Sequence, residues 1–357
     1  GEYSKEAYNS AFESLAAALK NHFASKTGRR KGKRMGWPKF KSKRHTTPRF
    51  AYTTGSFGLV EGDPKVLKLP RIGRVHCMEN IAGRVGDAKV VRMSVSRRAG
   101  RWYASLTVEH EDKPVSSPPK GGSVGVDLGV KALATLSDGT VFDNPRLLKR
   151  AHRKLRKAHK ALSRREPGSN RWKRARLRLQ KAHAHVASQR RDGLNKLTTQ
   201  LAGTYTDIGI EDLNVSGMVR NHNLAQAISD CGFRELRRQL EYKTARTGAK
   251  LHVVNRWCPS SKTCSNCGTV KAKLPLNERT YRCDACGLRI DRDLNAAINI
   301  NVAGSAPETV NARGGVVRHD RPAPAAQTPV NREPSSQNNG MRLGADLGNE
   351  VMQTTAN

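Results

Sequence analysis

The stretch Val124-Gly125-Val126-Asp127-Leu128-Gly129 places one acidic residue inside an apolar run. Such a run is expected to form a buried strand, where an isolated carboxylate is costly unless it is paired or binds a metal ion. Capping explains an acid at the end of an element, but Asp127 lies within one. Short apolar runs follow at 132–136 and 141–142, with Ser137-Asp138-Gly139 as the turn between them. The segment is therefore predicted to be a β-meander whose first strand carries an unexplained carboxylate.

Two further acidic residues stand at the ends of predicted elements. Glu211 follows the predicted strand 205–210, and Asp293 opens a predicted helix. Taken singly, a strand-end or N-cap acid is the commoner explanation, and capping alone would account for Asp293. If both met Asp127, the three carboxylates would suit phosphodiester hydrolysis, because two Mg²⁺ ions roughly 4 Å apart activate water and stabilise the leaving oxygen. Sequence spacing leaves open whether the three converge.

The high positive net charge of the chain indicates which kind of molecule it binds. The chain has 357 residues, with 65 Lys+Arg against 30 Asp+Glu and a formal net charge of +35. That surplus repels itself unless a polyanion is present, so nucleic acid is the expected partner and an anionic membrane surface the second choice. Residues 146–191 hold eighteen Lys/Arg and one acid, which favours a basic helical hairpin facing nucleic acid over a solvated arm. No apolar run approaches a membrane span, which excludes an integral membrane protein.

Four of the seven cysteines form two pairs at metal-ligand spacing. Cys264 and Cys267 make one C-x-x-C pair, Cys283 and Cys286 make the other, and fifteen residues separate the pairs. This spacing predicts a tetrahedral thiolate site for structural zinc. Cys258 is a possible spare ligand that we expect not to be used, and the other two are expected to be buried thiols. An odd cysteine count without a leader sequence favours a reducing cytoplasm.

The remaining segments are predicted to build the surroundings of these motifs. Residues 4–24 carry an apolar stripe at helical spacing, and a basic loop with two aromatic residues follows at 26–44. Residues 47–112 alternate in a way typical of a small barrel or curled sheet, and 113–122 is expected to be a linker. Residues 223–247 are predicted to be helical and 251–254 a strand. The stripe consists of Tyr8, Phe12, Leu15, Leu19 and Phe23, and the aromatic residues are Trp37 and Phe40.

In their order along the chain, these motifs resemble the TnpB (OrfB) proteins of bacterial insertion sequences, which are relatives of type V CRISPR nucleases. The motifs are GVDLG at 125–129, IEDLNV at 210–215, SSKTCSNCG at 260–268 and DRDLNAAINI at 291–300. The resemblance implies that Asp127, Glu211 and Asp293 are the Mg²⁺-binding catalytic acids. Asp291 is the alternative third acid. Asp293 is preferred because the family's acid stands two residues before an asparagine, which here is Asn295. The four paired cysteines match the family's zinc ribbon.

The resemblance also implies a multi-domain fold of the α+β and α/β classes. An N-terminally truncated recognition helix with its basic loop would occupy 1–46, and part of a wedge β-barrel with a helical insert would occupy 47–120. An RNase H-like RuvC nuclease domain would span 121–302, containing a basic helical hairpin at 146–200 and an inserted zinc ribbon at 256–290. A disordered tail would follow at 303–357, where the composition after Val302 also favours disorder.

The family uses an RNA from its own element to guide DNA cleavage, so guide RNA and target DNA are the implied partners. We therefore expect an RNA-guided, metal-dependent DNA endonuclease encoded in a mobile element. Two alternatives remain. One is a truncated remnant that binds nucleic acid and cuts nothing, and the other is a transposase or transposase-accessory protein that takes part in strand joining.

Overall fold

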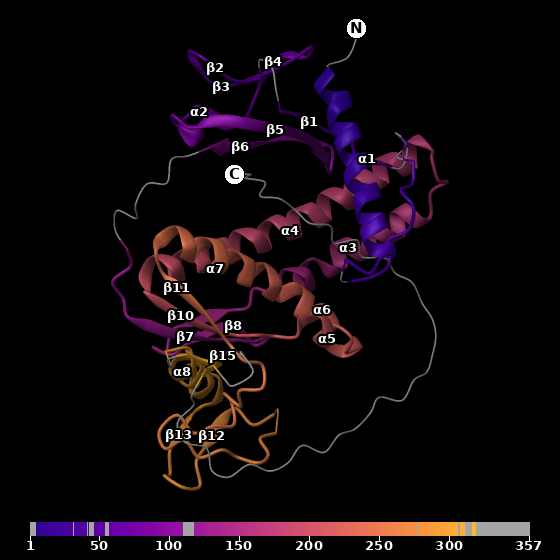
Figure 1. The fold of residues 1–357 in the computed structure, drawn as a ribbon. Coiled ribbons are helices and arrows are strands. Elements are labelled where there is room, and N and C mark those ends of the chain that lie inside the picture. The colour runs from indigo at the N-terminus through magenta and orange to yellow at the C-terminus, as the bar shows by residue number, and fades with distance from the viewer. Residues whose placement is uncertain are drawn as a thin grey trace. The chain divides into compact units, whose positions relative to one another are not determined.

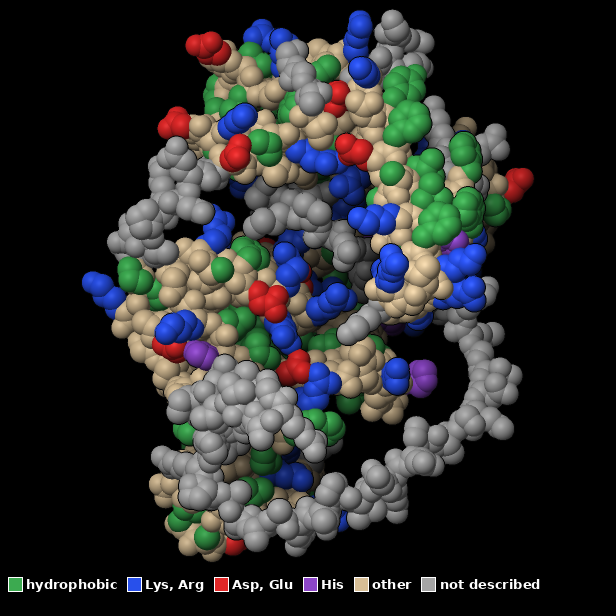
Figure 2. All heavy atoms as spheres, viewed as in Figure 1, with side chains coloured by type: hydrophobic (Ala, Val, Ile, Leu, Met, Phe, Trp, Pro, Cys, Tyr) green, Lys and Arg blue, Asp and Glu red, His purple; other side chains and the backbone are tan. Residues whose placement is uncertain are grey.

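A computed structural model describes residues 5–30, 32–40, 42, 46–53, 57–109, 118–275, 277–305, 308–310 and 316–318. The chain forms two compact units that divide between residues 112 and 113. Among the described helices, none is both long and apolar enough to cross a bilayer. Lys and Arg side chains are spread widely over the face of the molecule shown in Figure 2, whereas acidic side chains are scattered.

The first unit contains one long helix and two antiparallel sheets of three strands (Figure 1). One sheet has the order β1-β5-β6 and the other the order β2-β3-β4. A single core joins both sheets, because Tyr52, Leu67 and Met93 pack together from three different strands. The elements are α1 (Lys5–Lys26), β1 (Arg49–Tyr52), β2 (Gly58–Val60), β3 (Asp63–Leu69), β4 (Gly73–His76), α2 (Ile81–Val85), β5 (Lys89–Arg98) and β6 (Arg101–Glu109).

Two sequence expectations for this unit can be compared with the structure. Within the segment predicted to be a small barrel or curled sheet, a hairpin turn joins β5 to β6 through Ala99 and Gly100, which both adopt positive φ, at 49° and 84°. Two left-handed residues suit the twist of a two-residue hairpin. The predicted amphipathic helix also forms, but its stripe stays open to solvent within the described residues: Phe12 is 69% exposed and Phe23 is 51% exposed.

The second unit is built on a five-stranded sheet with the order β11-β10-β7-β8-β9. Strands β7, β8 and β9 pair antiparallel as the predicted meander, and β10 and β11 extend the sheet in parallel on the other side of β7. The sheet therefore combines an antiparallel meander with a parallel pair, which agrees with the predicted mixed fold class. The strands are β7 (Ser123–Leu128), β8 (Ala132–Leu136), β9 (Val141–Asp143), β10 (Asp207–Glu211) and β11 (Lys250–Val254).

Helices cover both faces of this sheet (Figure 1). On one face, leucines of α4 and α7 pack against Val126, Ile208 and Ile210 in the largest core cluster. On the other face lies α8, which contacts β7, β10 and β11. The predicted basic hairpin is formed by α3 (Leu147–Ser163) and α4 (Asn170–Thr204). The other helices are α5 (Val215–Met218), α6 (His222–Cys231), α7 (Phe233–Thr247) and α8 (Arg292–Ser305).

The cysteine segment is inserted between β11 and α8, as expected for the ribbon. It contains the antiparallel pair β12 (Thr280–Arg282) and β13 (Arg289–Asp291). The predicted tail at 303–357 lies mostly outside the described residues, but its start differs from the prediction. Helix α8 continues to Ser305, and β14 (Glu308–Val310) pairs with β15 (Val316–Arg318). Helix α8 continues because its next turns still bury apolar residues such as Ala303 against the sheet.

Candidate functional site

Two of the three predicted acids lie at the ends of neighbouring parallel strands. Val126 of β7 is the register partner of Ile210 of β10, so Asp127 and Glu211 occupy the next positions along the two strands. Val126 and Ile210 point into the core with α4 and α7. Because side chains alternate along a strand, the two acids project to the opposite face, where α8 lies.

The third acid reaches this face on helix α8. Asp293 lies in the first turn of α8. The helix can approach because Gly125 and Gly209 lie beneath it: a Cβ at Gly125 would stand 2.0 Å from the carbonyl oxygen of Ala297. A glycine where another backbone passes this closely is a steric requirement of the packing.

Asp127 is influenced by the charges of both other predicted acids. The pKa of Asp127 is raised to about 8, first by burial and then by the negative charges of Glu211 and Asp293, while Arg292 opposes the shift. A carboxylate that is both partly desolvated and surrounded by like charges is stable in its ionised form only with a compensating cation. The convergence of the three acids on one cation therefore stays a prediction.

The capping explanation belongs to Asp291 and not to Asp293. Oδ1 of Asp291 accepts hydrogen bonds from the backbone N–H groups of Asp293 at 2.9 Å and Leu294 at 3.2 Å. The expectation that capping alone would account for Asp293 is therefore wrong, because α8 begins at Arg292, two residues earlier than that role requires. Asp291 is exposed, whereas Asp293 is half-buried. Asp291 also raises the pKa of Asp127, but less than Asp293 does, so Asp293 stays the predicted third acid.

These oxygen donors fit a hard divalent cation. Mg²⁺ prefers carboxylate oxygens and usually keeps several water ligands, so a small number of protein carboxylates suffices. Asp127, Glu211 and Asp293 offer such a set, and their mutual repulsion is the feature that a bound cation would relieve.

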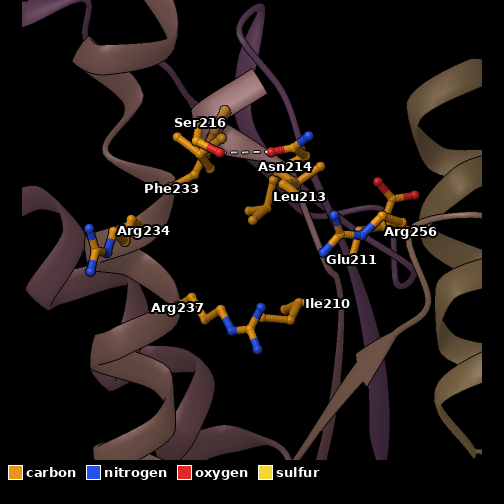
Figure 3. A pocket seen from close by; sticks show the side chains of 11 residues that line it. Ile210, Glu211, Leu213, Asn214, Ser216, Phe233, Arg234, Arg237 and Arg256 are labelled. Carbon is orange, nitrogen blue, oxygen red and sulfur yellow. Dashed lines mark hydrogen bonds between the residues drawn. The ribbon is translucent and has the colours of Figure 1, made fainter. Parts of the chain in front are cut away.

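A pocket of about 420 Å³ opens beside Glu211. Figure 3 shows Arg234 and Arg237 of α7 across this pocket from Glu211 and Arg256. Sequence reasoning missed these arginines, since no local pattern singles out arginine in so basic a chain. The other lining residues are Leu128, Ile210, Leu213, Asn214, Val215, Ser216 and Phe233.

One acidic residue organises two of the pocket arginines. Asp212 accepts from Arg237 at 2.6 Å and from Nε of Arg256 at 3.1 Å. The hydrogen bond from Arg256 is the largest of the effects that lower the pKa of Asp212. Arg237 also pairs through Nε with Glu241 at 3.1 Å, so the two guanidinium groups are held by two carboxylates beside Glu211. Guanidinium geometry suits phosphate oxygens.

The four paired cysteines come together as predicted. Their sulfur atoms all lie within 4.8 Å of one another, with Cys264 and Cys286 at 3.6 Å and Cys267 and Cys283 at 3.5 Å. In a tetrahedral site with Zn–S bonds of about 2.3 Å, neighbouring sulfur atoms lie about 3.8 Å apart, so the cluster fits zinc. Cys258 lies outside this cluster and packs against a separate apolar group.

The thiols of the cluster differ in their readiness to ionise. The Thr269 hydroxyl, 3.2 Å from the sulfur of Cys267, and the backbone of Thr269 lower the pKa of Cys267 to about 6. Burial raises the pKa of Cys264 to about 12. Since metals bind thiolates, Cys267 needs less help to deprotonate than Cys264 does.

Comparison with known proteins identifies two matching family models. Residues 105–222 match a family described as "Probable transposase", and residues 233–300 match "Cas12f1-like, TNB domain". The first covers β7 to β10 with the basic hairpin, and the second covers the ribbon and most of α8.

The chain is also similar to several named relatives over most of its length. A Streptomyces pristinaespiralis protein named for an RNA-guided DNA endonuclease activity is 37% identical over 95% of this chain and 81% of its own. The Escherichia coli protein InsQ, named for the same activity, is 33% identical over 87% of this chain and 77% of its own. A solved Cas12f1–sgRNA–target DNA complex aligns with a TM-score of 0.47 at 15% identity, over 80% of this chain and 69% of that one.

Proposed function

Because the chain belongs to the TnpB (OrfB) family, we propose that it is an RNA-guided DNA endonuclease of an insertion sequence. Relatives at 33% and 37% identity are named for that activity, and the chain spans about four fifths of their length. The observation that carries the proposal is that Asp127 of β7 and Glu211 of β10 project to the sheet face covered by α8, the helix that carries Asp293, in a chain with a net charge of +35.

Asp127, Glu211 and Asp293 would hold two Mg²⁺ ions in a RuvC-type active site. Bound Mg²⁺ supplies an activated water and stabilises the leaving oxygen of the phosphodiester. The protein's own contribution would be to present Asp127 and Glu211 on the sheet face that α8 covers and to desolvate Asp127 by burial. The arrangement costs folding energy, which is characteristic of a site built for a bound cation rather than for stability.

The pocket arginines would position the DNA strand. Arg237 and Arg256, fixed by Asp212, face the pocket that Glu211 borders. They would bind phosphate oxygens of the strand and leave its scissile bond at the carboxylates. The helical hairpin α3–α4, with its unbalanced positive charge, would bind the phosphate backbone of the guide RNA or of the heteroduplex.

The four cysteines would hold a structural zinc ion and keep the ribbon folded. A structural Cys₄ site contributes folding energy directly, so the ribbon depends on the metal. Free thiolates of this kind persist in a reducing compartment, which places the protein in the cytoplasm under this proposal.

The proposal is tested on protein purified from cells that carry the flanking element. RNA that travels with the protein would be extracted and sequenced. One protected species from the end of the element supports the proposal and supplies the guide for a cleavage assay. Heterogeneous RNA, or none, contradicts guide binding and supports a remnant that binds nucleic acid without a guide.

A further inference from the structure

One hydroxyl group connects the cysteine ribbon to the candidate metal site. Ser260 donates a hydrogen bond from Oγ to Oε1 of Glu211, and the Ser260 residue is only 5% exposed. Ser260 lies four residues before Cys264, while Glu211 ends strand β10. The contact therefore joins the segment just before the first cysteine pair to a proposed ligand of the divalent cation.

We infer that Ser260 is a positioning residue: it orients the Glu211 carboxylate for the divalent cation and thereby couples the folded ribbon to the nuclease site. This inference rests on the proposed function, because it takes Glu211 to be a metal ligand. The hydrogen bond occupies one carboxylate oxygen and restricts rotation of the group, which leaves Oε2 in a fixed direction for a cation. Partners of this kind orient metal ligands throughout metalloproteins.

The backbone around Ser260 is held firmly enough for this role. Asn299 donates from Nδ2 to the carbonyl oxygens of Ser260 and Thr263, each at 2.7 Å. Asn295 is fully buried; it donates to the same Thr263 oxygen at 2.7 Å and accepts from the N–H of Ser265 at 2.9 Å. Two asparagines one turn apart on α8 thus fix the loop that carries Ser260.

The other end of the ribbon reaches the site by a second route. Strand β13 ends at Asp291, and helix α8 begins at the next residue and carries Asp293 in its first turn. The N–H of Arg292 also donates to the carbonyl oxygen of Arg279 in the ribbon at 2.8 Å. The ribbon is therefore connected to two of the three predicted acids. It contacts Glu211 through the hydrogen bond from Ser260, and it is linked to Asp293 because β13 leads directly into α8.

The test compares three variants of the full chain. Ser260→Ala removes the hydroxyl, and Ser260→Thr restores it. Ser261→Ala is the matched control, because the Ser261 hydroxyl makes no hydrogen bond to any residue that the structure describes. The probe is Mn²⁺ alone, with its binding to zinc-loaded, RNA-free protein followed by the loss of the free Mn²⁺ signal in electron paramagnetic resonance.

We expect Ser260→Ala to weaken Mn²⁺ binding by about 10- to 100-fold, the usual effect of losing a partner that orients a metal ligand. Ser260→Thr and Ser261→Ala should bind Mn²⁺ like the wild type. Zinc content, by mass spectrometry, and the melting temperature should be unchanged in all three. Unaltered Mn²⁺ binding in Ser260→Ala overturns the inference. Loss of zinc or a lowered melting temperature in that variant also overturns it, because the role would then be structural.

Asp127→Asn separates this inference from the proposed function. If Asp127→Asn loses Mn²⁺ binding while Ser260→Ala keeps it, the metal site stands and only the role of Ser260 is wrong. If Asp127→Asn binds Mn²⁺ like the wild type, the cation site is not at these carboxylates, and both proposals are contradicted.

Discussion

Gly125 of β7 and Gly209 of β10 are register partners in the parallel part of the sheet, and helix α8 packs directly on both of them. Each glycine precedes a proposed metal ligand by two positions, Asp127 in one strand and Glu211 in the other. Because alternate residues share a face, the glycines and the acids lie on the same side of the sheet. The missing Cβ atoms therefore let α8 come close enough to add Asp293 to the site.

This relationship predicts that Gly125→Ala damages the site without touching an acid. The new Cβ would stand 2.0 Å from the Ala297 carbonyl oxygen and 2.4 Å from the backbone nitrogen of Asn301, so α8 must move. We expect a loss of roughly 1–3 kcal/mol in the free energy of unfolding, typical of overpacking, together with loss of cleavage. Thermal unfolding and a cleavage assay measure the two effects.

Gly193→Ala is the matched control for that substitution. Gly193 lies inside α4, and no described atom stands within 4 Å of the position of its added Cβ. Alanine should raise helix stability there by up to about 1 kcal/mol. Normal stability and cleavage in Gly125→Ala would show that α8 does not depend on this close approach.

The metal-free protein should lose stability as the pH rises. The pKa of Asp127 is raised from 3.8 to about 8 in the folded state, so between these values the folded chain binds a proton that the unfolded chain has released. Stability is then fully present below pH about 4 and falls as the pH approaches 8. Thermal unfolding of metal-free wild type and Asp127→Asn across this range measures the slope, which should be smaller in the variant.

Mg²⁺ should reverse the loss at the upper end of that range. A cation that binds only the folded state stabilises it in proportion to the logarithm of its concentration. At pH 8 we expect the melting temperature of the wild type to rise with added Mg²⁺, and that of Asp127→Asn to stay constant. An equal rise in both proteins would place the stabilising cation elsewhere.

Elements with a local signal were predictable from the sequence. The meander around Asp127, the basic hairpin and the paired cysteines each depend on patterns within a few dozen residues, and the structure contains all three. The contacts that organise the site are different in kind. Ser260 and Glu211 are 49 residues apart in the chain, so only the folded sheet and ribbon bring them together.

Sequence-based prediction of the site was also limited where one local motif offers two candidate residues. The segment at 291–293 offers two acids to the same helix terminus, and the sequence favours Asp293 only by its distance from Asn295. The N–H groups of Asp293 and Leu294 both donate to Asp291, which identifies Asp291 as the helix cap and leaves Asp293 as the candidate metal ligand. That distinction depends on where the helix begins, which sequence patterns define least well.

The ribbon should require zinc for its local fold. Its buried core is small, with Leu274 and Tyr281 packed against Cys264 and Cys283, so the thiolate–metal bonds must supply much of its stability. We expect about one zinc per chain, and we expect a chelator to raise amide hydrogen exchange within 256–290 while β7 stays protected. Folded protein without zinc would refute this assignment.

A partly buried ion pair should hold the basic hairpin α3–α4 to helix α6, which carries Asp230. Asp230 pairs with Arg190 of α4 at 2.9 Å and accepts from the N–H of Leu148, in the first turn of α3, at 2.8 Å. Its side chain is 5% exposed, so Asp230→Ala should cost about 3 kcal/mol of the free energy of unfolding by leaving Arg190 without its partner. Urea unfolding of the variant gives this value directly.

Asp192 provides the control for that measurement. Asp192 pairs with Lys196 at 2.8 Å on the exposed face of α4, the helix that also carries Arg190. Since exposed pairs contribute little, Asp192→Ala should change the free energy of unfolding by less than about 1 kcal/mol. Equal losses in the two variants would mean that burial of Asp230 adds nothing to its pairing.

The most direct test of the account is cleavage by RNA-loaded protein and its acid variants, with Mg²⁺ and a DNA that matches the co-purified RNA. Asp127→Ala and Asp293→Asn should retain the RNA and fail to cut. Asp291→Asn should cut, because asparagine still caps α8 and Asp291 lies outside the predicted triad. Cleavage by Asp127→Ala at the wild-type rate would contradict the assignment of these carboxylates as the nuclease site.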